Sequence, residues 1–281
     1  MARKKPEQVA TGFSFTEGPR WHDGQLFFSD FYNYKVRSVD AAGNVETVVH
    51  VEHQPSGLGW LPDGRMLVVS MTNRKLLRME SDGALSEHAD LSEIAAFHCN
   101  DMAVDELGRA WVGNFGFDNE GGQPGPATLA QVMPDGTVRA AADGLMFPNG
   151  TMISPDGKTL VVAETYARRL TAFDIADDGT LSNRRLWAET GDHWPDGCCM
   201  DAEGAIWVAD PRGGCVVRVL EGGEVTEQID TGRGAFACVL GGNDRRDLYI
   251  CTSSGAGAQA RTAQDASIER VTVDVPGAGI P

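Results

Sequence analysis

A unit of 40 to 50 residues recurs along the chain and constrains its fold more than any other feature. Each copy has a short apolar segment, a turn built on Asp-Gly or a related sequence, and then an alternating strand. In the five clear copies the turn glycines are spaced 40, 44, 49 and 47 residues apart, and a weaker sixth copy lies around Asp244. These turn glycines are Gly24, Gly64, Gly108, Gly157 and Gly204. A repeat of this length is typical of a molecule built from stacked or radially arranged units.

The residues of each copy predict four antiparallel β-strands. Asp-Gly adopts a tight turn with positive φ at little cost and so joins two strands. The segments that follow the turns are apolar, β-branched and aromatic, as strands buried on both faces should be. These segments are QLFFSD, RMLVVS, TLVVAE, AIWVAD and DLYICT. Four strands per unit and six units predict an all-β, six-bladed β-propeller, which we expect to occupy residues 1–281 as a single domain.

Two segments depart from this pattern. The glycine-rich stretch NEGGQPGPATL, residues 119–129, interrupts the third unit. We interpret it first as a flexible loop between strands, with a mobile flap over the functional site as the alternative. The segment DLSEIAAF, residues 90–97, carries the only hint of a helical turn.

Composition limits the classes of function. The chain has 24 basic and 40 acidic residues and a formal net charge of −16. This excess argues against nucleic-acid binding, which needs clustered Lys and Arg, and favours cations or neutral substrates. No apolar run reaches the roughly eighteen residues of a membrane span, so we expect no membrane partner. The basic N-terminus lacks the apolar stretch of a signal peptide, so we expect a cytoplasmic protein.

The six cysteines are expected to be buried free thiols, because none of them forms a C-x-x-C pair. A zinc site on Cys198 and Cys199 is the weaker alternative, since adjacent thiols rarely both reach one metal. The chain also lacks a G-x-S-x-G motif, which argues against a serine nucleophile.

Four oxygen-bearing side chains occur at one phase of the repeat, about eight residues before the turn glycine. They are Glu17, Asn100, Asn149 and Asp196, and the second unit has Ser56 at this phase. The innermost strands of a propeller line a central channel, so equivalent positions of different blades meet near the axis. Each Asn or Asp before Gly could also be an ordinary turn residue, but their shared phase favours a joint role.

Two carboxylates and two amide oxygens form an all-oxygen set that suits a divalent cation. Calcium prefers such ligands, so we predict a calcium site at the centre of the propeller. Without a cation, the two carboxylates would repel each other in a poorly solvated channel. Magnesium, manganese and iron(II) remain alternatives, and zinc is less favoured without a nearby imidazole.

The repeat segments resemble the SMP-30/gluconolactonase/luciferin-regenerating-enzyme (LRE) family over nearly the whole chain. The resemblance implies a six-bladed propeller with a catalytic metal, commonly calcium, and its characterised members include sugar lactonases. The related diisopropyl-fluorophosphatase and paraoxonase propellers show a similar Glu, Asn, Asn, Asp cluster. The segments are TEGPRW, PSGLGWLPDGRMLV, CNDMAVDELGRAWVG, FPNGTMISPDGKTLVVAE, PDGCCMDAEGAIWVAD and ACVLGGNDRRDLYICT.

By this resemblance, Glu17, Asn149 and Asp196 match direct metal ligands, and Asp196 resembles the proposed general base. Asn100 matches a position that binds metal in some members and contacts substrate in others. Sugar-lactonase members often carry Arg two positions before this Asn, where it can contact sugar hydroxyls, but this chain has His98 there. His98 is either a packed neutral residue or a group that contacts substrate or handles protons, and specificity for sugar lactones is open.

Several flanking residues are weaker candidates. Phe115, Trp194 and Met146 could form apolar walls around a bulky substrate, or could be core or rim residues. His193 and His53 are ordinary loop histidines or residues at the mouth of the site. The neighbouring carboxylate Asp101 is expected to lie on the opposite side of its strand and to be structural.

We therefore expect a metal-dependent hydrolase that opens a sugar or other small lactone. In this hypothesis the metal polarises the ester carbonyl and Asp196 deprotonates the attacking water. The partner is a small-molecule lactone or ester, and the oligomeric state is open. The alternatives are a phosphotriesterase-like or fluorophosphatase-like hydrolase, a non-catalytic calcium-binding propeller, and a lyase or isomerase on the same frame.

Overall fold

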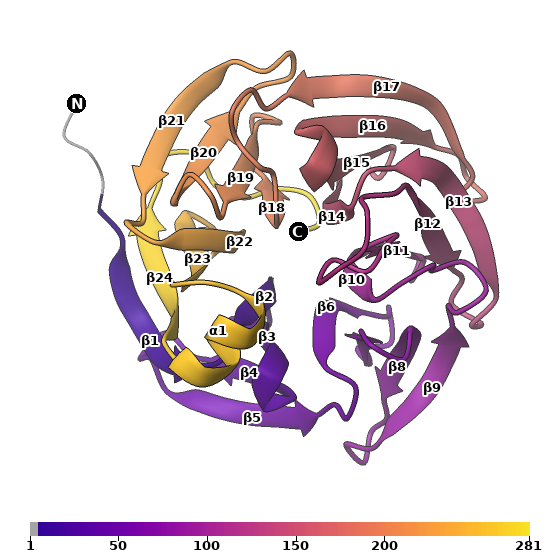
Figure 1. Ribbon diagram of the computed structural model, residues 1–281, viewed down its shortest axis with the longest axis horizontal. Helices are drawn as coiled ribbons and strands as arrows, with labels where there is room; N and C mark the ends of the chain where they lie inside the picture. The colour runs from indigo at the N-terminus through magenta and orange to yellow at the C-terminus, as the bar shows by residue number, and fades with distance from the viewer. Residues whose placement is uncertain (1–4) are drawn as a thin grey trace.

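The computed structural model describes residues 5–281 and arranges them as six four-stranded antiparallel sheets around a central axis (Figure 1). This confirms the predicted all-β, six-bladed propeller. The innermost strands surround the axis, and five of the six are buried along their whole length or at all but one residue. The innermost strands are β2 (Thr16–His22), β6 (Pro55–Trp60), β10 (Cys99–Val104), β14 (Pro148–Ile153), β18 (Cys198–Met200) and β22 (Gly234–Gly241).

The second strands are the apolar segments that follow the turn glycines, and they pair with the inner strands across those turns. They are β3 (Gln25–Asp30), β7 (Met66–Ser70), β11 (Ala110–Asn114), β15 (Thr159–Glu164), β19 (Ile206–Asp210) and β23 (Asp247–Ser253). The third strands lie outside them. They are β4 (Lys35–Val39), β8 (Lys75–Met79), β12 (Ala127–Val132), β16 (Arg169–Ile175), β20 (Cys215–Val219) and β24 (Ala266–Thr272).

The outermost strands form the rim of the disc and are the most exposed (Figure 1). They are β5 (Val45–His50), β9 (Leu85–Asp90), β13 (Val138–Leu145), β17 (Leu181–Glu189), β21 (Val225–Asp230) and β1 (Glu7–Phe13). β1 comes from the start of the described chain and yet completes the last blade. It pairs antiparallel with β24, from Glu7 opposite Arg270 to Phe13 opposite Ala266. This pairing closes the ring, because it joins the start of the described chain to the blade formed by its last strands.

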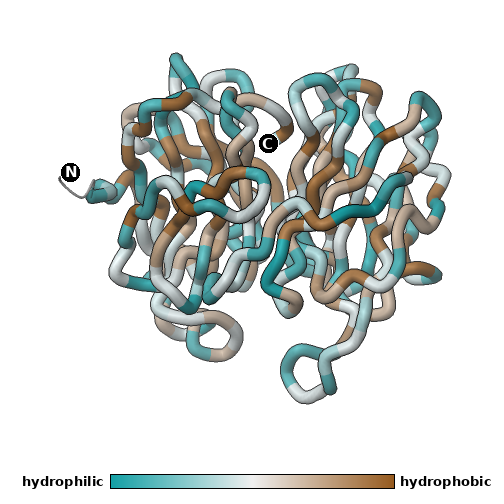
Figure 2. The backbone as a smooth tube through the Cα atoms, turned by 90° about the horizontal axis from the view of Figure 1, so that it is seen from above, coloured by the Kyte–Doolittle hydropathy of each residue, from teal (hydrophilic) through white to brown (hydrophobic). Residues whose placement is uncertain are grey.

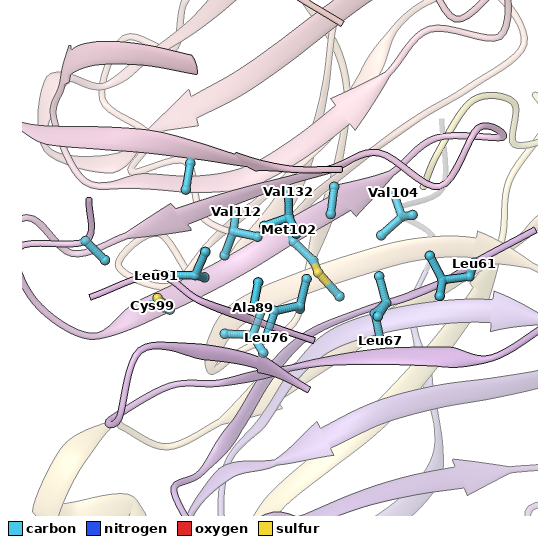
Figure 3. Close-up of a cluster of buried hydrophobic side chains, with 14 residues drawn as sticks. Leu61, Leu67, Leu76, Ala89, Leu91, Cys99, Met102, Val104, Val112 and Val132 are labelled. Carbon is cyan, nitrogen blue, oxygen red and sulfur yellow. The ribbon is translucent and has the colours of Figure 1, made fainter. Parts of the chain in front are cut away.

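The hydrophobic core lies mainly between neighbouring blades. Figure 3 shows the cluster between blades two and three, where Leu67 and Leu76 pack against Met102 and Val112. Two indoles, Trp111 and Trp207, are fully buried in two other clusters. Along the backbone, hydrophobic stretches run through the blades and hydrophilic residues are frequent in the loops at their ends (Figure 2). Packing of each blade on both neighbours explains why the second strands are apolar on both faces.

The last residues of the chain close one end of the channel. The backbones of Ile280 and Ile153 exchange hydrogen bonds of 3.0 and 2.7 Å, and Met200 donates to the Pro281 carbonyl oxygen at 3.2 Å. Ile153 and Met200 end their inner strands, so this tail lies at the end opposite to the starts of those strands. The C-terminus accordingly lies near the axis in Figure 1.

The non-strand elements differ in part from the sequence expectation. Asp90 ends β9, and residues 92–94 form a turn in which the Ala95 N–H donates to the Leu91 carbonyl oxygen at 2.8 Å, which is a single helical turn as expected. The one α-helix of the described chain is α1 (Gly257–Ala263), which the sequence reading missed because only Ala260 of its residues is buried and no apolar periodicity marks it. Two short 3-10 turns, η1 (Phe31–Asn33) and η2 (Thr165–Ala167), follow β3 and β15. The glycine-rich segment 119–129 leads from β11 into β12, as the loop interpretation predicts.

All six cysteines are buried and unpaired, which confirms the expectation of free thiols. Cys198 packs in the cluster between blades four and five, whereas Cys199 packs in the cluster between blades five and six. The two adjacent side chains therefore point to opposite faces of their strand, and one metal ion does not fit between them.

Candidate functional site

A cavity of about 550 Å³ opens at the end of the channel where the inner strands begin. Its lining includes Glu17, Asn100, Asn149, Asp196 and His98, so the five residues selected from the sequence lie around one space. Each of the first four begins an inner strand or lies close to its start, and each is at most 8% exposed. The repeat phase thus brings side chains from four blades together.

Close packing between inner strands explains the residue that follows each candidate. A glycine stands there in four of five blades. A Cβ on Gly18 would lie 2.8 Å from the Ser56 carbonyl oxygen, and one on Gly150 would lie 2.6 Å from that of Asp196. Both distances are too short for a real side chain, so the neighbouring backbone requires glycine. The Asn-Gly and Asp-Gly pairs here mark contacts between blades rather than tight turns.

Asn149 and Asp196 are in direct contact across two blades. The Asn149 Nδ2 atom donates a short hydrogen bond to Asp196 Oδ1 and a second, of 3.3 Å, to Thr165 Oγ1. The Thr165 hydroxyl in turn donates to the carbonyl oxygen of Pro195 at 2.7 Å. Thr165 therefore ties the amide of Asn149 to the segment that carries Asp196. The sequence reading missed Thr165, because it lies on η2 and outside the repeat phase.

Glu17 is held by its own strand and experiences a strongly negative environment. The backbone N–H of Gly18 donates to Glu17 Oε2 at 3.0 Å. Burial, reinforced by the charges of Asp196 and Asp101, raises the pKa of Glu17 well above its ordinary value. Burial likewise raises the pKa of Asp196, against the opposing effect of the Asn149 hydrogen bond. Ionisation of both carboxyls is thus unfavourable unless a positive charge compensates for their negative charges.

Asp101 is the residue that follows Asn100, where the other blades have glycine. It is buried and forms an ion pair with Arg20, whose Nη2 atom lies 2.7 Å from Asp101 Oδ1. Arg20 also donates through Nη1 to the Pro19 carbonyl oxygen at 2.8 Å. Asp101 therefore has the structural partner that was expected of it. Its charge still reaches the site, since it contributes to the raised pKa of both Glu17 and Asp196.

The donor set fits a hard divalent cation. Glu17 and Asp196 supply two carboxylates, and Asn100 and Asn149 supply two amides, all bordering the same cavity. Calcium, magnesium and manganese take such oxygen ligands. A bound cation would offset the repulsion between the two buried carboxylates. The raised pKa of each carboxyl indicates that the site favours a bound cation.

His98 lies in the cavity wall and is flanked by aromatic rings. Its imidazole stacks on Phe97 with 4.1 Å between ring centroids and lies 6.0 Å from the ring of Phe115. Burial lowers the pKa of His98, and Asp118 and Glu120 oppose this only in part. His98 is therefore mainly neutral near pH 7, with one ring nitrogen able to donate and the other to accept a hydrogen bond.

Only one of the weaker candidates from the sequence lines the cavity. Phe115 lines the cavity, whereas Trp194, Met146, His53 and His193 are not among its lining residues. Instead His193 binds Asp210 through Nδ1, at 2.8 Å from Oδ2, with the Cys215 thiol 4.0 Å away.

These three residues form the one group of three or more His, Cys, Asp and Glu side chains in residues 5–281 whose ligand atoms all lie within 4.8 Å of one another. Asp210 Oδ1 accepts hydrogen bonds from the backbone N–H groups of Arg212 and Gly213. The His193–Asp210 contact ties the loop before β18 to the end of β19, and the two backbone hydrogen bonds hold the turn after β19, so the cluster has a structural role.

The glycine-rich loop borders the site. Asn119 and Glu120 from this loop line the cavity together with Asp118, and Arg261 and Gly257 from α1 line it as well. That the loop moves as a flap stays a prediction. Across residues 5–281, no helix is long and apolar enough to cross a membrane.

Comparison with known proteins places the chain among lactonase-like propellers. Residues 15–254 match the SMP-30/Gluconolactonase/LRE-like region. A 6-deoxy-6-sulfogluconolactonase from Pseudomonas putida is 27% identical over 279 residues, covering 94% of this chain and 93% of the relative. Regucalcin from Danio rerio is 28% identical over 279 residues, with 94% of this chain and 91% of regucalcin covered.

Solved structures share the fold. A calcium-binding protein, regucalcin, from Agrobacterium tumefaciens superposes with a TM-score of 0.84 at 21% identity, covering 99% of this chain and 97% of that one. A gluconolactonase from Xanthomonas campestris gives a TM-score of 0.77 at 24% identity, with 96% and 89% covered. With the family match over most of its length, the chain belongs to the SMP-30/gluconolactonase/LRE-like family.

Proposed function

We propose that the protein is a metal-dependent lactonase that hydrolyses a small lactone to the corresponding hydroxy acid. The observation that carries the proposal is the pair of buried carboxylates, Glu17 and Asp196, that borders one cavity with Asn100 and Asn149. Lactonase relatives in the same family support it. We assign the metal to Glu17, Asn100, Asn149 and Asp196, with calcium as the expected ion.

A divalent cation bound by these residues would supply Lewis-acid polarisation of the lactone carbonyl and stabilise the negative charge that develops on its oxygen. Asp196 acts as general base and accepts a proton from the water that attacks the carbonyl carbon. The hydrogen bond from Asn149 orients this carboxylate, and Thr165 orients Asn149. Glu17, restrained by the Gly18 N–H, supplies the second negative charge of the metal site.

The reaction consumes one water molecule. A new bond forms between the carbonyl carbon and the water oxygen, the ring C–O bond breaks, and the ring oxygen leaves as the hydroxyl of the product. His98 borders the same cavity, and its low pKa makes it a neutral donor near pH 7. We assign His98 to a hydrogen bond with the substrate, and the proton that Asp196 accepts from water passes, directly or through solvent, to the leaving ring oxygen. Asn100 is assigned to both metal and substrate contact.

The test is turnover of a lactone panel after chelation and after addition of calcium, manganese, iron(II), zinc or magnesium in turn. We expect chelation to abolish turnover and one of these ions, most effectively calcium, to restore it. The matched variants are Asp196→Asn at the site and Asp82→Asn on an exposed turn. Full lactone turnover in chelator, or in Asp196→Asn, would overturn the proposal. Metal binding without turnover of any lactone would instead indicate a non-catalytic calcium-binding propeller.

A further inference from the structure

Phenylalanine side chains surround the candidate metal site. Six of the eleven phenylalanines in the chain line this one cavity, and we call them the aromatic collar. Four members are at most 9% exposed, so their contacts are those of a packed wall. The collar consists of Phe15, Phe31, Phe97, Phe115, Phe147 and Phe236.

The collar is built from two walls. On blades six and one, Phe15 lies 4.7 Å from Phe236 and 5.3 Å from Phe31, measured between ring centroids. On blades three and four, Phe115 stacks on Phe147 with 4.5 Å between centroids and an interplanar angle of 17°. Phe115 also packs against the cluster that contains the first wall. These ring contacts give each wall a defined shape, because neighbouring rings hold one another in place.

The repeat itself places part of this collar. Phe15 stands two positions before Glu17, and Phe147 stands two positions before Asn149. His98 has the same relation to Asn100. Phe15, His98 and Phe147 all line the cavity beside the candidate ligands that follow them. Blades one, three and four therefore each present a residue that would hold the metal together with a residue that would contact a substituent beside it.

The six rings of the collar offer no hydrogen-bonding groups for the hydroxyls of a sugar, although polar side chains such as Gln54 and Asn119 line other parts of the cavity. The cavity also offers little attraction for an anion. A buried hydroxyl that finds no hydrogen-bond partner weakens binding, and a phenyl ring is no substitute for one. Of the Asp, Glu, Lys and Arg side chains that line the cavity, four are acidic and one, Arg261, is basic. Arg261 lies over the ring of Tyr32, 4.8 Å from its centroid. A divalent cation would offset only part of the negative charge.

We propose that the substrate is a neutral lactone that carries an apolar substituent, which the aromatic collar receives, rather than a polyhydroxylated or anionic lactone. This inference rests on the proposed lactonase function and names its substrate class. The substituent takes the place of water against the phenyl rings, and the ester carbonyl faces Glu17, Asn149 and Asp196. The 6-deoxy-6-sulfogluconolactonase relative differs in this respect, because its name describes an anionic sugar lactone.

Three lactones with the same six-membered ring test whether the site prefers an apolar substituent, no substituent or hydroxyl groups. They are δ-valerolactone, which has no substituent, δ-decalactone, which has a pentyl chain, and glucono-δ-lactone, which has hydroxyls. The full chain is assayed with the cation that best restores activity, and each kcat/KM is divided by the rate of uncatalysed hydrolysis. We expect δ-decalactone to exceed δ-valerolactone by about 10- to 100-fold, with glucono-δ-lactone lowest, since an apolar pocket discriminates by this amount per small group.

A substitution in the collar gives a matched comparison. Phe115→Leu should lower the ratio of kcat/KM for δ-decalactone over δ-valerolactone by about 5-fold or more, because part of the wall is lost. The control Phe27→Leu, on β3 and outside the cavity lining, should leave this ratio unchanged. The ratio of two substrates on one protein sample does not depend on the fraction that is folded. An unchanged ratio in Phe115→Leu would overturn the role of the collar.

Binding without turnover provides an independent readout. 6-Pentylpiperidin-2-one is the lactam analogue of δ-decalactone and resists hydrolysis, and piperidin-2-one is its unsubstituted counterpart. By calorimetry we expect the pentyl lactam to bind about 10-fold more tightly than the bare lactam. Equal affinities, or a preference for glucono-δ-lactone in the assay, overturn this inference but leave the lactonase function standing. Absence of metal-dependent hydrolysis of all three lactones overturns the lactonase function itself.

Discussion

Asp196 accepts a short hydrogen bond from Asn149 Nδ2, although 47 positions separate the two residues in the sequence. The two side chains come from the starts of adjacent inner strands, so their contact depends on the spacing between blades four and five. Gly150 sets this spacing, because its backbone N–H donates to the Asp196 carbonyl oxygen at 3.1 Å. The geometry of the candidate site is therefore a property of how two blades pack and not of either blade alone.

Gly150→Ala should impair the site through this packing. The new Cβ would lie 2.6 Å from both the Asp196 carbonyl oxygen and the Cys198 backbone nitrogen, so the two strands must separate. We expect a loss of about 1–3 kcal/mol in unfolding free energy. A displacement of catalytic groups by about 1 Å costs on the order of 100-fold in rate, so we expect kcat to fall by about that factor. Chemical denaturation and steady-state kinetics measure the two effects.

The control for this prediction is Gly121→Ala. Gly121 has open space around its Cβ position and a φ that an alanine adopts without strain. This variant should keep the stability of the parent protein. If Gly150→Ala is as stable and as active as the parent, the close approach of β14 and the segment before β18 does not control the site.

Loss of either candidate carboxylate should abolish lactone turnover. Glu17→Gln and Asp196→Asn each remove one of the two negative charges that would hold the cation, and the second also removes the base. We expect kcat/KM to fall by about 100- to 1,000-fold or more in each variant. Calorimetric titration with calcium should show weaker binding in both. Wild-type kinetics in either variant would be incompatible with the proposed roles.

Stability without metal should fall as the pH rises. The unfolded chain has ordinary carboxyl pKa values near 4, whereas burial raises the pKa of Glu17 and Asp196 in the folded protein. The folded state then binds more protons than the unfolded state, and its stability decreases as the pH rises above about 4 and through the raised values. In chelator, the melting temperature should therefore drop toward neutral pH, and calcium should restore it.

Glu17→Gln tests this linkage directly. It removes one of the repelling carboxylates, so the metal-free variant should melt a few degrees higher than the metal-free parent near pH 8, at about 2–4 °C per kcal/mol. Glu93→Gln, at an exposed position, is the control and should follow the parent curve. Identical melting curves for parent and Glu17→Gln in chelator would contradict the predicted repulsion.

The ion pair between Arg20 and Asp101 should be important for stability. Both side chains are at most 7% exposed, so Arg20→Leu leaves a buried carboxylate without its partner. We expect a loss of about 3–5 kcal/mol in unfolding free energy, and a smaller loss in the double variant Arg20→Leu/Asp101→Leu, which removes both charges. Guanidinium denaturation measures both.

A surface pair supplies the comparison. Lys75 and Glu87 lie 2.5 Å apart, but their side chains are 32% and 50% exposed. Lys75→Ala should cost no more than about 1 kcal/mol, because solvent screens an exposed pair. If Arg20→Leu lowers the unfolding free energy by no more than Lys75→Ala does, burial of the Asp101 carboxylate does not require its ion pair with Arg20.

Much of the fold could be predicted from short sequence patterns. Asp-Gly turns and apolar alternation predicted the strands of each blade, and counting the copies predicted six blades. The common phase of Glu17, Asn100, Asn149 and Asp196 was sufficient to place them around one cavity. The helix α1 and the closing strand β1 were missed, because one carries no periodic apolar face and the other lies outside the repeat.

The contacts between different blades could not be predicted from the sequence and are determined by the tertiary structure. The sequence alone determined which residues form strands and which of them start the inner strands, because turn formation and alternation act over a few residues. Only the packing of blades decided that Asn149 bonds to Asp196, that Arg20 neutralises Asp101, and that six phenylalanines face one cavity. Such contacts depend on distances through space between residues far apart in the chain, and no local pattern encodes them.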